Sequence, residues 1–264
     1  QGIDVVFNAL HGEYGEDGTV QRILDLYGMP YTGSNSLESA VAFNKQNTKN
    51  ALRSTGIKMA QGMPFTLQAS EDIDQAAKDV FNSFPAPWVV KPLASGSSVG
   101  VSVAKDYHSL VDMLHTARTG SDRVLVEQYI QGREATCGVS DQFRGEDIYA
   151  FFPIEIIPPQ GDSHWTYEAK YNGSSQEICP GNFTHDQKKE IEDISRMVHK
   201  NLGLRHYSRS DFIITPNGIY FLEVNTLPGL TSESLLPKAV KAAGAKLSEF
   251  FDHLIQLALR KTRH

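Results

Sequence analysis

The stretch that decides the fold is SRSDFIITPNGIYFLEVN, residues 208–225. Two apolar runs flank a Pro-Asn-Gly turn, so we predict a β-hairpin here. Side chains alternate between the two faces of a strand, so Arg209 and Asp211 share one face of the first arm. Glu223 and Asn225 share one face of the second arm. Oxygen donors on one side of a ladder predict a site for a hard cation such as Mg²⁺, completed by water and phosphate oxygens. A half-exposed hairpin with a charged face is the alternative.

The bulk composition is ordinary for a globular protein. The chain has 264 residues, 40% of them hydrophobic and 21% charged, which is enough for one large or two to three small domains. The net charge of −6 argues against nucleic acid as the main partner, because no basic excess meets a phosphate backbone. No apolar run reaches the ~20 residues that span a bilayer. We therefore expect a cytoplasmic protein that binds neither nucleic acid nor membrane.

The first residues predict the rear part of a strand–helix domain, residues 1–43, whose front is missing. The chain opens with Gln1 rather than an initiator Met, so we expect further residues upstream. An apolar run at 5–10 predicts a strand, and the next helix is predicted to begin at an Asp17 cap. A second helical stretch at 36–55 is predicted to break near Phe43.

Two further units are predicted, at 44–132 and 133–264. The first of them has α/β character, with strands and helices in alternation. Its expected elements are a helix capped by Ser70 that runs to 84, strands 88–92 and 101–104, a helix at 107–118 and a strand at 123–130. The second has expected strands at 133–140 and 147–157, a long irregular stretch to 180, a helix that follows a Thr184 capping box, the hairpin, and helices 232–243 and 247–261.

A lysine before a Gly/Ser-rich loop is the second motif that carries chemistry. Lys91 ends an apolar strand, and ASGSSVG follows at 94–100. Small residues let backbone N–H groups approach phosphate oxygens, and the lysine adds a positive charge. The lysine precedes the loop, so the pattern is not a P-loop but a strand–loop–strand flap over a nucleotide. An ordinary hairpin turn is the alternative.

Three other stretches carry weaker signals. Glu127 lies at a strand end, where backbone groups can meet a purine base, and Glu134 follows beyond a Gly-Arg break; a plain surface strand end is the alternative. Lys170 lies in a loop long enough to be a lid, with a solvated loop as the alternative. Lys45 is a single lysine on a predicted helix, and such a residue is expected to lie at the solvated surface. Cys137 and Cys179 have no base nearby in sequence, so no nucleophile is assigned.

The order of these motifs resembles the ATP-grasp superfamily, an α/β fold in which two α/β subdomains clamp ATP. Within it, the motifs are similar to those of the D-alanine–D-alanine ligase family. The resemblance runs from Asp4 to about Ala258, nearly the whole chain. The stretches that carry it are LHG at 10–12, GEDG at 15–18, YTGS at 31–34, GSSVG at 96–100, YEAKY at 167–171 and EVNTLPGLTS at 223–232.

The resemblance implies a reaction. ATP phosphorylates the carboxylate of a first D-alanine, and the amine of a second D-alanine attacks the acylphosphate, which yields D-alanyl-D-alanine for peptidoglycan synthesis. Both steps depend on charge neutralisation and positioning. The implied cofactors are ATP and two Mg²⁺ (or Mn²⁺) ions, and the implied assembly is a homodimer of the intact protein.

The resemblance also implies roles for individual residues. Lys45 and Lys91 would contact ATP phosphates, Ser97 would hold the flap over them, Glu127 and the backbone of Tyr129 and Ile130 would hold adenine, and Glu134 would hold the ribose. Lys170 would reach the γ-phosphate from the lid, with Tyr171 closing it.

The resemblance further implies how metal and substrates are held. Asp211, Glu223 and Asn225 would hold the metal ions. Arg209 and the Gly229 backbone N–H would stabilise the oxyanion. Ser234 and Leu235 would bind the second D-alanine, and His11 would lie near the first.

The family pattern begins with a strand and a Gly-rich loop that are not in this sequence. Two alternatives to the dipeptide ligase therefore stay open. One is a depsipeptide ligase that joins D-alanine to D-lactate, although the YEAKY stretch favours the dipeptide enzyme. The other is a catalytically weak ATP-binding fragment that lacks the N-terminal substrate loop.

Overall fold

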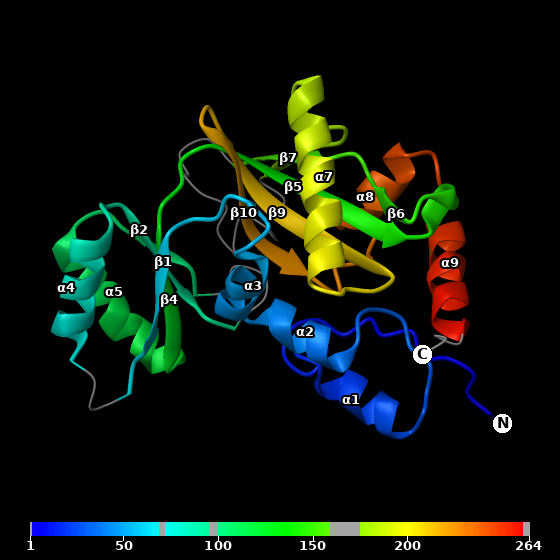
Figure 1. The fold of residues 1–264 in the computed structure, drawn as a ribbon, viewed down its shortest axis with the longest axis horizontal. Helices are drawn as coiled ribbons and strands as arrows, with labels where there is room; N and C mark the ends of the chain where they lie inside the picture. The colour runs from blue at the N-terminus through cyan, green and yellow to red at the C-terminus, as the bar shows by residue number, and fades with distance from the viewer. Residues whose placement is uncertain (1, 69–71, 95–99, 159–174, 261–264) are drawn as a thin grey trace.

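The protein contains two antiparallel sheets that lie side by side, with a helical N-terminal segment against them (Figure 1). The structure is a computed structural model and describes residues 2–68, 72–94, 100–158 and 175–260. The smaller sheet has four strands in the order β1-β4-β2-β3. The larger sheet has six, in the order β10-β9-β5-β7-β8, with β6 paired to β5. This mixed architecture agrees with the predicted fold class.

The smaller sheet is covered by two helices that bury one apolar face. Trp88 lies at the centre of this core and is 1% exposed. The predicted Ser70 cap lies outside the described residues; the helix is capped instead by Asp72, whose carboxylate accepts the N–H of Gln75 at 3.2 Å. The elements are β1 Gly62–Thr66, α4 Ile73–Ser83, β2 Trp88–Pro92, β3 Ser102–Ala104, α5 Tyr107–Gly120 and β4 Arg123–Gln128.

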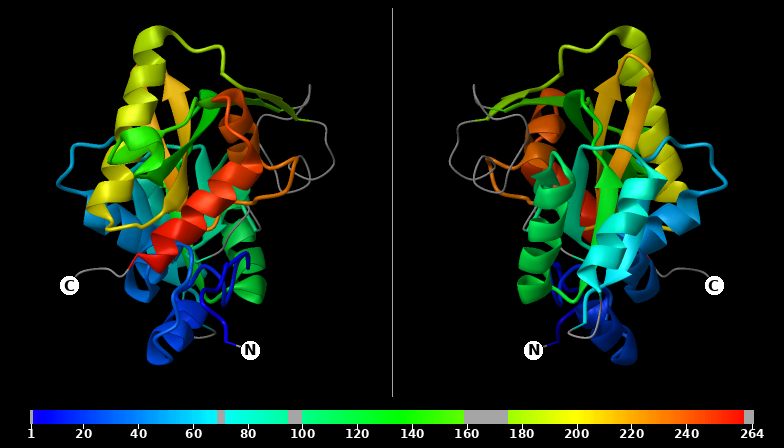
Figure 2. Two further views of the ribbon diagram at one scale, coloured as in Figure 1. Left: turned by 90° about the vertical axis from the view of Figure 1, so that its right-hand side faces the viewer. Right: turned by 90° about the vertical axis from the view of Figure 1, so that its left-hand side faces the viewer.

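The larger sheet is sandwiched between α7 on one face and α8 and α9 on the other (Figure 2). The Thr184 capping box is confirmed. The single strand predicted at 147–157 is wrong: two short strands form, separated by a segment that contains Pro153, which has no N–H to donate. The elements are β5 Arg133–Asp141, η1 Phe143–Gly145, β6 Ile148–Ala150, β7 Ile154–Ile157, β8 Gln176–Ile178, α7 His185–Asn201, β9 Tyr207–Thr215, β10 Gly218–Asn225, α8 Leu235–Ala242 and α9 Leu247–Leu259.

The predicted hairpin is formed by β9 and β10, and it contains an irregularity that the sequence pattern does not show. Phe221 pairs with Phe212 and Glu223 pairs with Asp211, so Leu222 is an extra residue in β10. Such a β-bulge shifts the alternation of side chains by one position. Phe221 therefore points into the core under α7, whereas Glu223 lines a cavity on the opposite face.

The N-terminal segment has three short helices: α1 Thr19–Leu26, α2 Ser36–Phe43 and α3 Lys45–Leu52. The predicted break is confirmed at Asn44, which is extended and whose side chain caps α3. The predicted strand at 5–10 is reduced to a single parallel bridge between Val6 and Tyr31. The predicted Asp17 cap is wrong, because Gly18 takes that position with φ of 89°. A Cβ at Gly18 would lie 2.2 Å from the Ser36 carbonyl oxygen.

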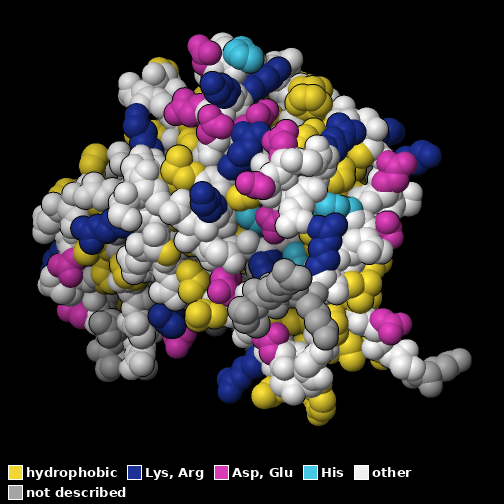
Figure 3. All heavy atoms as spheres, turned by 45° about the vertical axis from the view of Figure 1, so that its right-hand side comes forward, with side chains coloured by type: hydrophobic (Ala, Val, Ile, Leu, Met, Phe, Trp, Pro, Cys, Tyr) yellow, Lys and Arg dark blue, Asp and Glu magenta, His cyan; other side chains and the backbone are white. Residues whose placement is uncertain are grey.

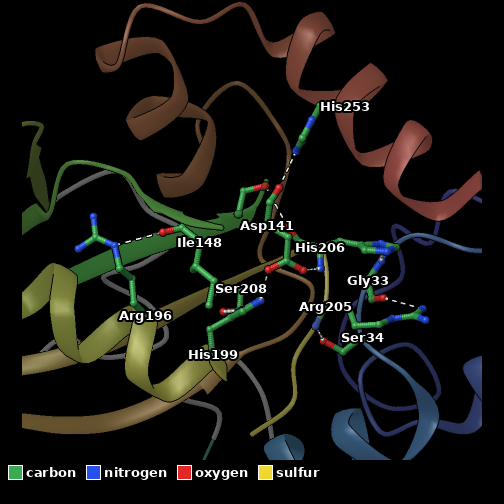
Figure 4. Close-up of polar contacts among 11 residues, drawn as sticks. Gly33, Ser34, Asp141, Ile148, Arg196, His199, Arg205, His206, Ser208 and His253 are labelled. Atoms are coloured by element: carbon green, nitrogen blue, oxygen red, sulfur yellow. Dashed lines mark hydrogen bonds and ion pairs between the residues drawn. The ribbon is translucent and has the colours of Figure 1, made fainter. Parts of the chain in front are cut away.

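A seam of polar contacts attaches this segment to the larger sheet (Figure 4). Gly33 N–H donates to His206 Nδ1 at 3.0 Å, and Arg205 N–H donates to Ser34 Oγ at 3.1 Å. Behind them, Asp141 at the end of β5 accepts the N–H of His206 at 2.6 Å. The seam therefore positions the N-terminal loop beside the start of β9. Across the described residues, no helix combines the length and apolarity that a membrane crossing requires.

Candidate active site

A cavity between the two sheets gathers eight of the site residues predicted from the sequence. Its walls come from β2, β3 and the end of β4 on one side, and from β5, β7, β9 and β10 on the other. Both sheets therefore contribute side chains to one site. The predicted site residues that line it are Lys45, Lys91, Glu127, Tyr129, Ile130, Glu134, Asp211 and Glu223.

The predicted oxygen donors meet on the cavity side of the hairpin. Glu223 is directly opposite Asp211 in the ladder, and Asn225 is opposite Arg209. Opposed residues lie on the same face of an antiparallel pair, so the expectation that the four side chains share one face is confirmed. The donors are carboxylate and amide oxygens, which is the chemistry that Mg²⁺ prefers. Among the described residues, no group of three or more His, Cys, Asp or Glu side chains is clustered as a metal site.

Asp211 is held by neighbours on two strands. Arg209 donates from Nε and Nη2 to its two carboxylate oxygens, each at 3.0 Å. Thr136, its partner on β5, donates from Oγ1 to Asp211 Oδ1 at 2.6 Å. Burial alone would lower the pKa of Arg209, but Asp211, with Glu223 and Glu16 further off, holds that pKa above its usual value. The guanidinium is therefore firmly cationic.

Lys45 is buried rather than solvated. Its side chain is 8% exposed, and its Nζ lies 3.1 Å from Glu223 Oε2. The surface position expected for an isolated helical lysine is therefore wrong. The reason is tertiary: α3 begins at Lys45, and its backbone N–H donates to Leu93 O at 3.0 Å, which brings the helix start against the end of β2.

Glu127 is the centre of a second set of ion pairs. Its two carboxylate oxygens contact two lysines: Oε2 contacts Lys91 Nζ, and Oε1 contacts Lys49 Nζ. Burial alone would raise the pKa of Glu127, but the two ammonium groups hold it below its usual value. Glu127 and Lys91 line the cavity, so the surface strand end considered for Glu127 is wrong.

A second group of predicted residues lies around the segment that follows β10. His11 Nδ1 is 3.0 Å from Leu227 O. Gly229 lies against the N-cap of α8, since a Cβ there would be 2.6 Å from Ser234 Oγ. Leu235 is the first residue of that helix and is buried. Three other predicted residues, Ser97, Lys170 and Tyr171, lie outside the described residues.

Three residues near these groups escaped the sequence interpretation. Glu16 is buried, accepts the Gly12 N–H at 2.6 Å and interacts electrostatically with His11 and Arg209; burial raises its pKa. Thr136 holds Asp211. Lys49 follows Lys45 by four positions, which puts both on one helix face. That spacing is a signal in the sequence, whereas nothing local marks Thr136.

The comparisons with known proteins agree along the whole chain. The family model described as D-ala D-ala ligase C-terminus matches residues 51–256, and the one described as D-ala D-ala ligase N-terminus matches residues 1–34. A D-alanine–D-alanine ligase of Desulfotalea psychrophila is 38% identical over 264 residues, which cover 99% of this chain and 80% of the relative.

Solved structures show the same relationship. The VanG D-Ala:D-Ser ligase from Enterococcus faecalis superimposes with a TM-score of 0.85 at 32% identity, over 97% of this chain and 73% of its own. The D-alanine–D-alanine ligase from Bacillus anthracis, complexed with ATP, has a TM-score of 0.81 at 34% identity, over 98% of this chain and 80% of its own. The chain therefore belongs to the D-alanine–D-alanine ligase family and is an enzyme with the ATP-grasp fold.

Proposed function

We propose that this ligase binds ATP in the cavity between the two sheets and uses it to join two D-alanines. One observation carries the proposal: the hairpin pairs Asp211 with Glu223 on the wall of a cavity that also contains Lys45 and Lys91. Lysines and oxygen donors that line one cavity fit a metal-bound polyphosphate. The ATP bound by the Bacillus anthracis relative supports the same assignment.

The nucleotide roles follow from position in the cavity. Lys45 and Lys91 contact the phosphates, because both ammonium groups reach the cavity from different elements, α3 and β2. Glu127 and the backbone of Tyr129 and Ile130 hold adenine at the end of β4. Glu134, at the start of β5, takes the ribose hydroxyls. Ser97, Lys170 and Tyr171 keep their proposed roles in the flap and the lid.

The metal ligands are Asp211, Glu223 and Asn225. The oxygen chemistry of this set fits Mg²⁺ or Mn²⁺, and bound ions would neutralise phosphate charge. Each carboxylate currently pairs with a cation, Asp211 with Arg209 and Glu223 with Lys45. Binding of nucleotide and metal therefore requires these pairs to exchange partners, with Lys45 moving from a carboxylate to a phosphate.

The residues that bind and activate the two D-alanines lie around Arg209 and α8. The carboxylate of the first D-alanine attacks the γ-phosphorus, ADP leaves, and the amine of the second D-alanine then displaces phosphate from the acylphosphate. Arg209 and the Gly229 N–H stabilise the oxyanion of the second step. Ser234 and Leu235, at the N-terminus of α8, bind the carboxylate of the second D-alanine, and His11 lies near the first.

Phosphate release tests the function directly. The protein is incubated with ATP and Mg²⁺, with D-alanine alone or with added D-serine or D-lactate, and the products are identified by mass spectrometry. We expect phosphate release that depends on D-alanine and a product that is D-alanyl-D-alanine. A product made only with D-lactate or D-serine would reassign the second substrate. ATP binding without any product would support the non-catalytic alternative.

The setting of the enzyme is also proposed. The free thiols of Cys137 and Cys179 fit the cytoplasm. Charges of both signs are interspersed on the face in Figure 3, which fits small-molecule substrates rather than nucleic acid. Hydrophobic side chains gather at the lower end of that view, where α1 lies; Leu26 is 79% exposed and Tyr27 81%. Such a surface fits a contact between two copies of the chain in a homodimer.

A further inference from the structure

Lys49 approaches the nucleotide cavity from behind its wall. It lies on α3, one turn after Lys45, and its side chain is 15% exposed. Its Nζ donates to the carbonyl oxygen of Ala60 and to Glu127 Oε1. Ala60 and Glu127 line the cavity, whereas Lys49 is not among the described residues that line it. Lys49 therefore contacts the wall without facing the ligand.

The local backbone leaves room for this contact. Gly62 on β1 is directly opposite Glu127 on β4. A Cβ at Gly62 would lie 2.7 Å from Glu127 Cγ and 3.4 Å from Lys49 Nζ. A side chain on β1 would thus displace the carboxylate. The position of Glu127 is consequently set by β1, by Lys49 and by Lys91.

The two lysines have different relations to the ligand. Lys91 lines the cavity and is the lysine proposed to contact phosphates, so its ammonium is shared with the nucleotide. A buried carboxylate that loses its counter-charge tends to take up a proton. Lys49 contacts Glu127 from behind the wall, so a nucleotide in the cavity does not compete for its ammonium group. An ionised carboxylate accepts hydrogen bonds only, whereas a protonated one also donates.

We propose that Lys49 is a positioning residue that holds Glu127 ionised and oriented as an acceptor for the 6-amino group of adenine, and thereby selects 6-aminopurine over 6-oxopurine nucleotides. The inference rests on the proposed role of Glu127 at the base. A carboxylate accepts the amino protons of adenine and repels the O6 atom of hypoxanthine or guanine. Loss of Lys49 lets Glu127 protonate and donate to O6, which erodes the selection.

The test compares ATP with inosine triphosphate in the wild-type enzyme and in Lys49→Met, by phosphate release at saturating D-alanine. We expect the preference for ATP, as the ratio of kcat/KM values, to fall about tenfold in Lys49→Met, mainly through KM for ATP, as for one lost charged hydrogen bond. Lys49→Arg should recover most of the preference. Lys49→Gln, which keeps a donor for Ala60, should behave as Lys49→Met and replaces it if that variant does not fold.

Lys58→Met is the matched control. Lys58 is an exposed lysine whose Nζ also donates to a backbone carbonyl, that of Asn217, and it does not line the cavity, so its loss should leave the preference unchanged. A second readout is pH: in Lys49→Met the KM for ATP should begin to rise at a higher pH on acidification than in the wild type, because Glu127 protonates more readily. An unchanged nucleotide ratio in folded Lys49→Met would overturn the inference. A wild-type enzyme that does not use ATP would overturn the proposed function itself, and this inference with it.

Discussion

The two ends of β5 carry polar groups, buried or partly buried, in different surroundings. At its start, Glu134 lines the cavity and Thr136 holds Asp211 beside it. At its end, Asp141 is partly buried and contacts three histidines: Oδ1 is 3.0 Å from His199 Nε2, Oδ2 accepts the His206 N–H, and the backbone oxygen accepts from His253 Nε2 at 2.7 Å (Figure 4). Both sets are rich in titratable side chains. They differ in setting: the first set lines the cavity, whereas the second joins separate elements of the fold.

This difference separates a ligand site from a structural junction. Around Asp141 the partners come from α7, from the residue just before β9 and from α9, and the contacts join parts of the fold that are distant in sequence. At the cavity wall, charged residues pair with one another, as Lys45 does with Glu223. Under the proposed function, pairs of that kind exchange for phosphate and metal. A buried charged cluster is therefore a functional candidate when it faces a cavity.

The largest expected effect is a loss of activity, which we expect for a change at the cavity and not for a change at Asp141. Glu223→Gln removes the negative charge opposite Asp211, and we expect kcat to fall about 10²- to 10³-fold with little change in melting temperature. The measurement is phosphate release at saturating ATP and D-alanine. Near-normal activity in this variant would remove Glu223 from the proposed metal ligands. Asp141→Asn is the comparison variant, since it should retain most of the activity.

The next largest effect is on the free energy of unfolding, and we expect it at Asp141. Asp141→Ala leaves His199 Nε2 and the His206 N–H without an acceptor, and we expect the free energy of unfolding to fall by about 3 kcal/mol. The measurement is urea unfolding, with KM for ATP as a second readout that should stay within about twofold of wild type. Asp252→Ala, an exposed carboxylate beside His253, is the control and should change stability by under ~0.5 kcal/mol. Equal losses in both variants would contradict the role given to Asp141.

The smallest expected effect is a loss of folding stability as the pH falls. Burial lowers the pKa of His206 to about 4, below its ordinary value near 6.5. The unfolded chain therefore binds a proton that the folded protein excludes, so the stability contribution is present above about pH 6.5 and is lost as the pH falls toward 4. Between about pH 7.5 and about pH 5 the loss is about 2 kcal/mol. His206→Asn has no such group and tolerates the left-handed backbone found here, φ 65°.

Unfolding curves at the two pH values, for wild type and His206→Asn, measure this difference. We expect the variant to lose about 2 kcal/mol less on acidification. Gly33 N–H now donates to His206 Nδ1, and the Asn side-chain oxygen offers an acceptor in its place. If both proteins lose the same free energy of unfolding on acidification, other groups cause the loss. Asp141 is one candidate, because His199 lowers its pKa against the opposing effect of burial.

Local sequence was a good guide where a pattern spans one element. The hairpin turn, the break at Asn44 and the capping box at Thr184 are all confirmed, because each depends on neighbours within a few residues. The family resemblance also picked out eight of the residues that line the cavity. The failures occurred where a distant segment decides. Lys45 is buried because α3 docks on the end of β2. In the apolar run at 5–10, the described pairing is limited to one bridge, between Val6 and Tyr31.

The sequence by itself determined that Asp211, Glu223 and Asn225 lie on a hairpin, since turn residues and apolar runs specify that locally. Only the tertiary structure decided which way they face. The bulge at Leu222 reverses the alternation, so that Phe221 enters the core and Glu223 enters the cavity. Likewise, only the docking of α3 and β1 on β4 brought Lys49 to Glu127. Side-chain periodicity follows from the backbone of one strand, whereas a bulge and an ion pair across elements depend on what packs against it.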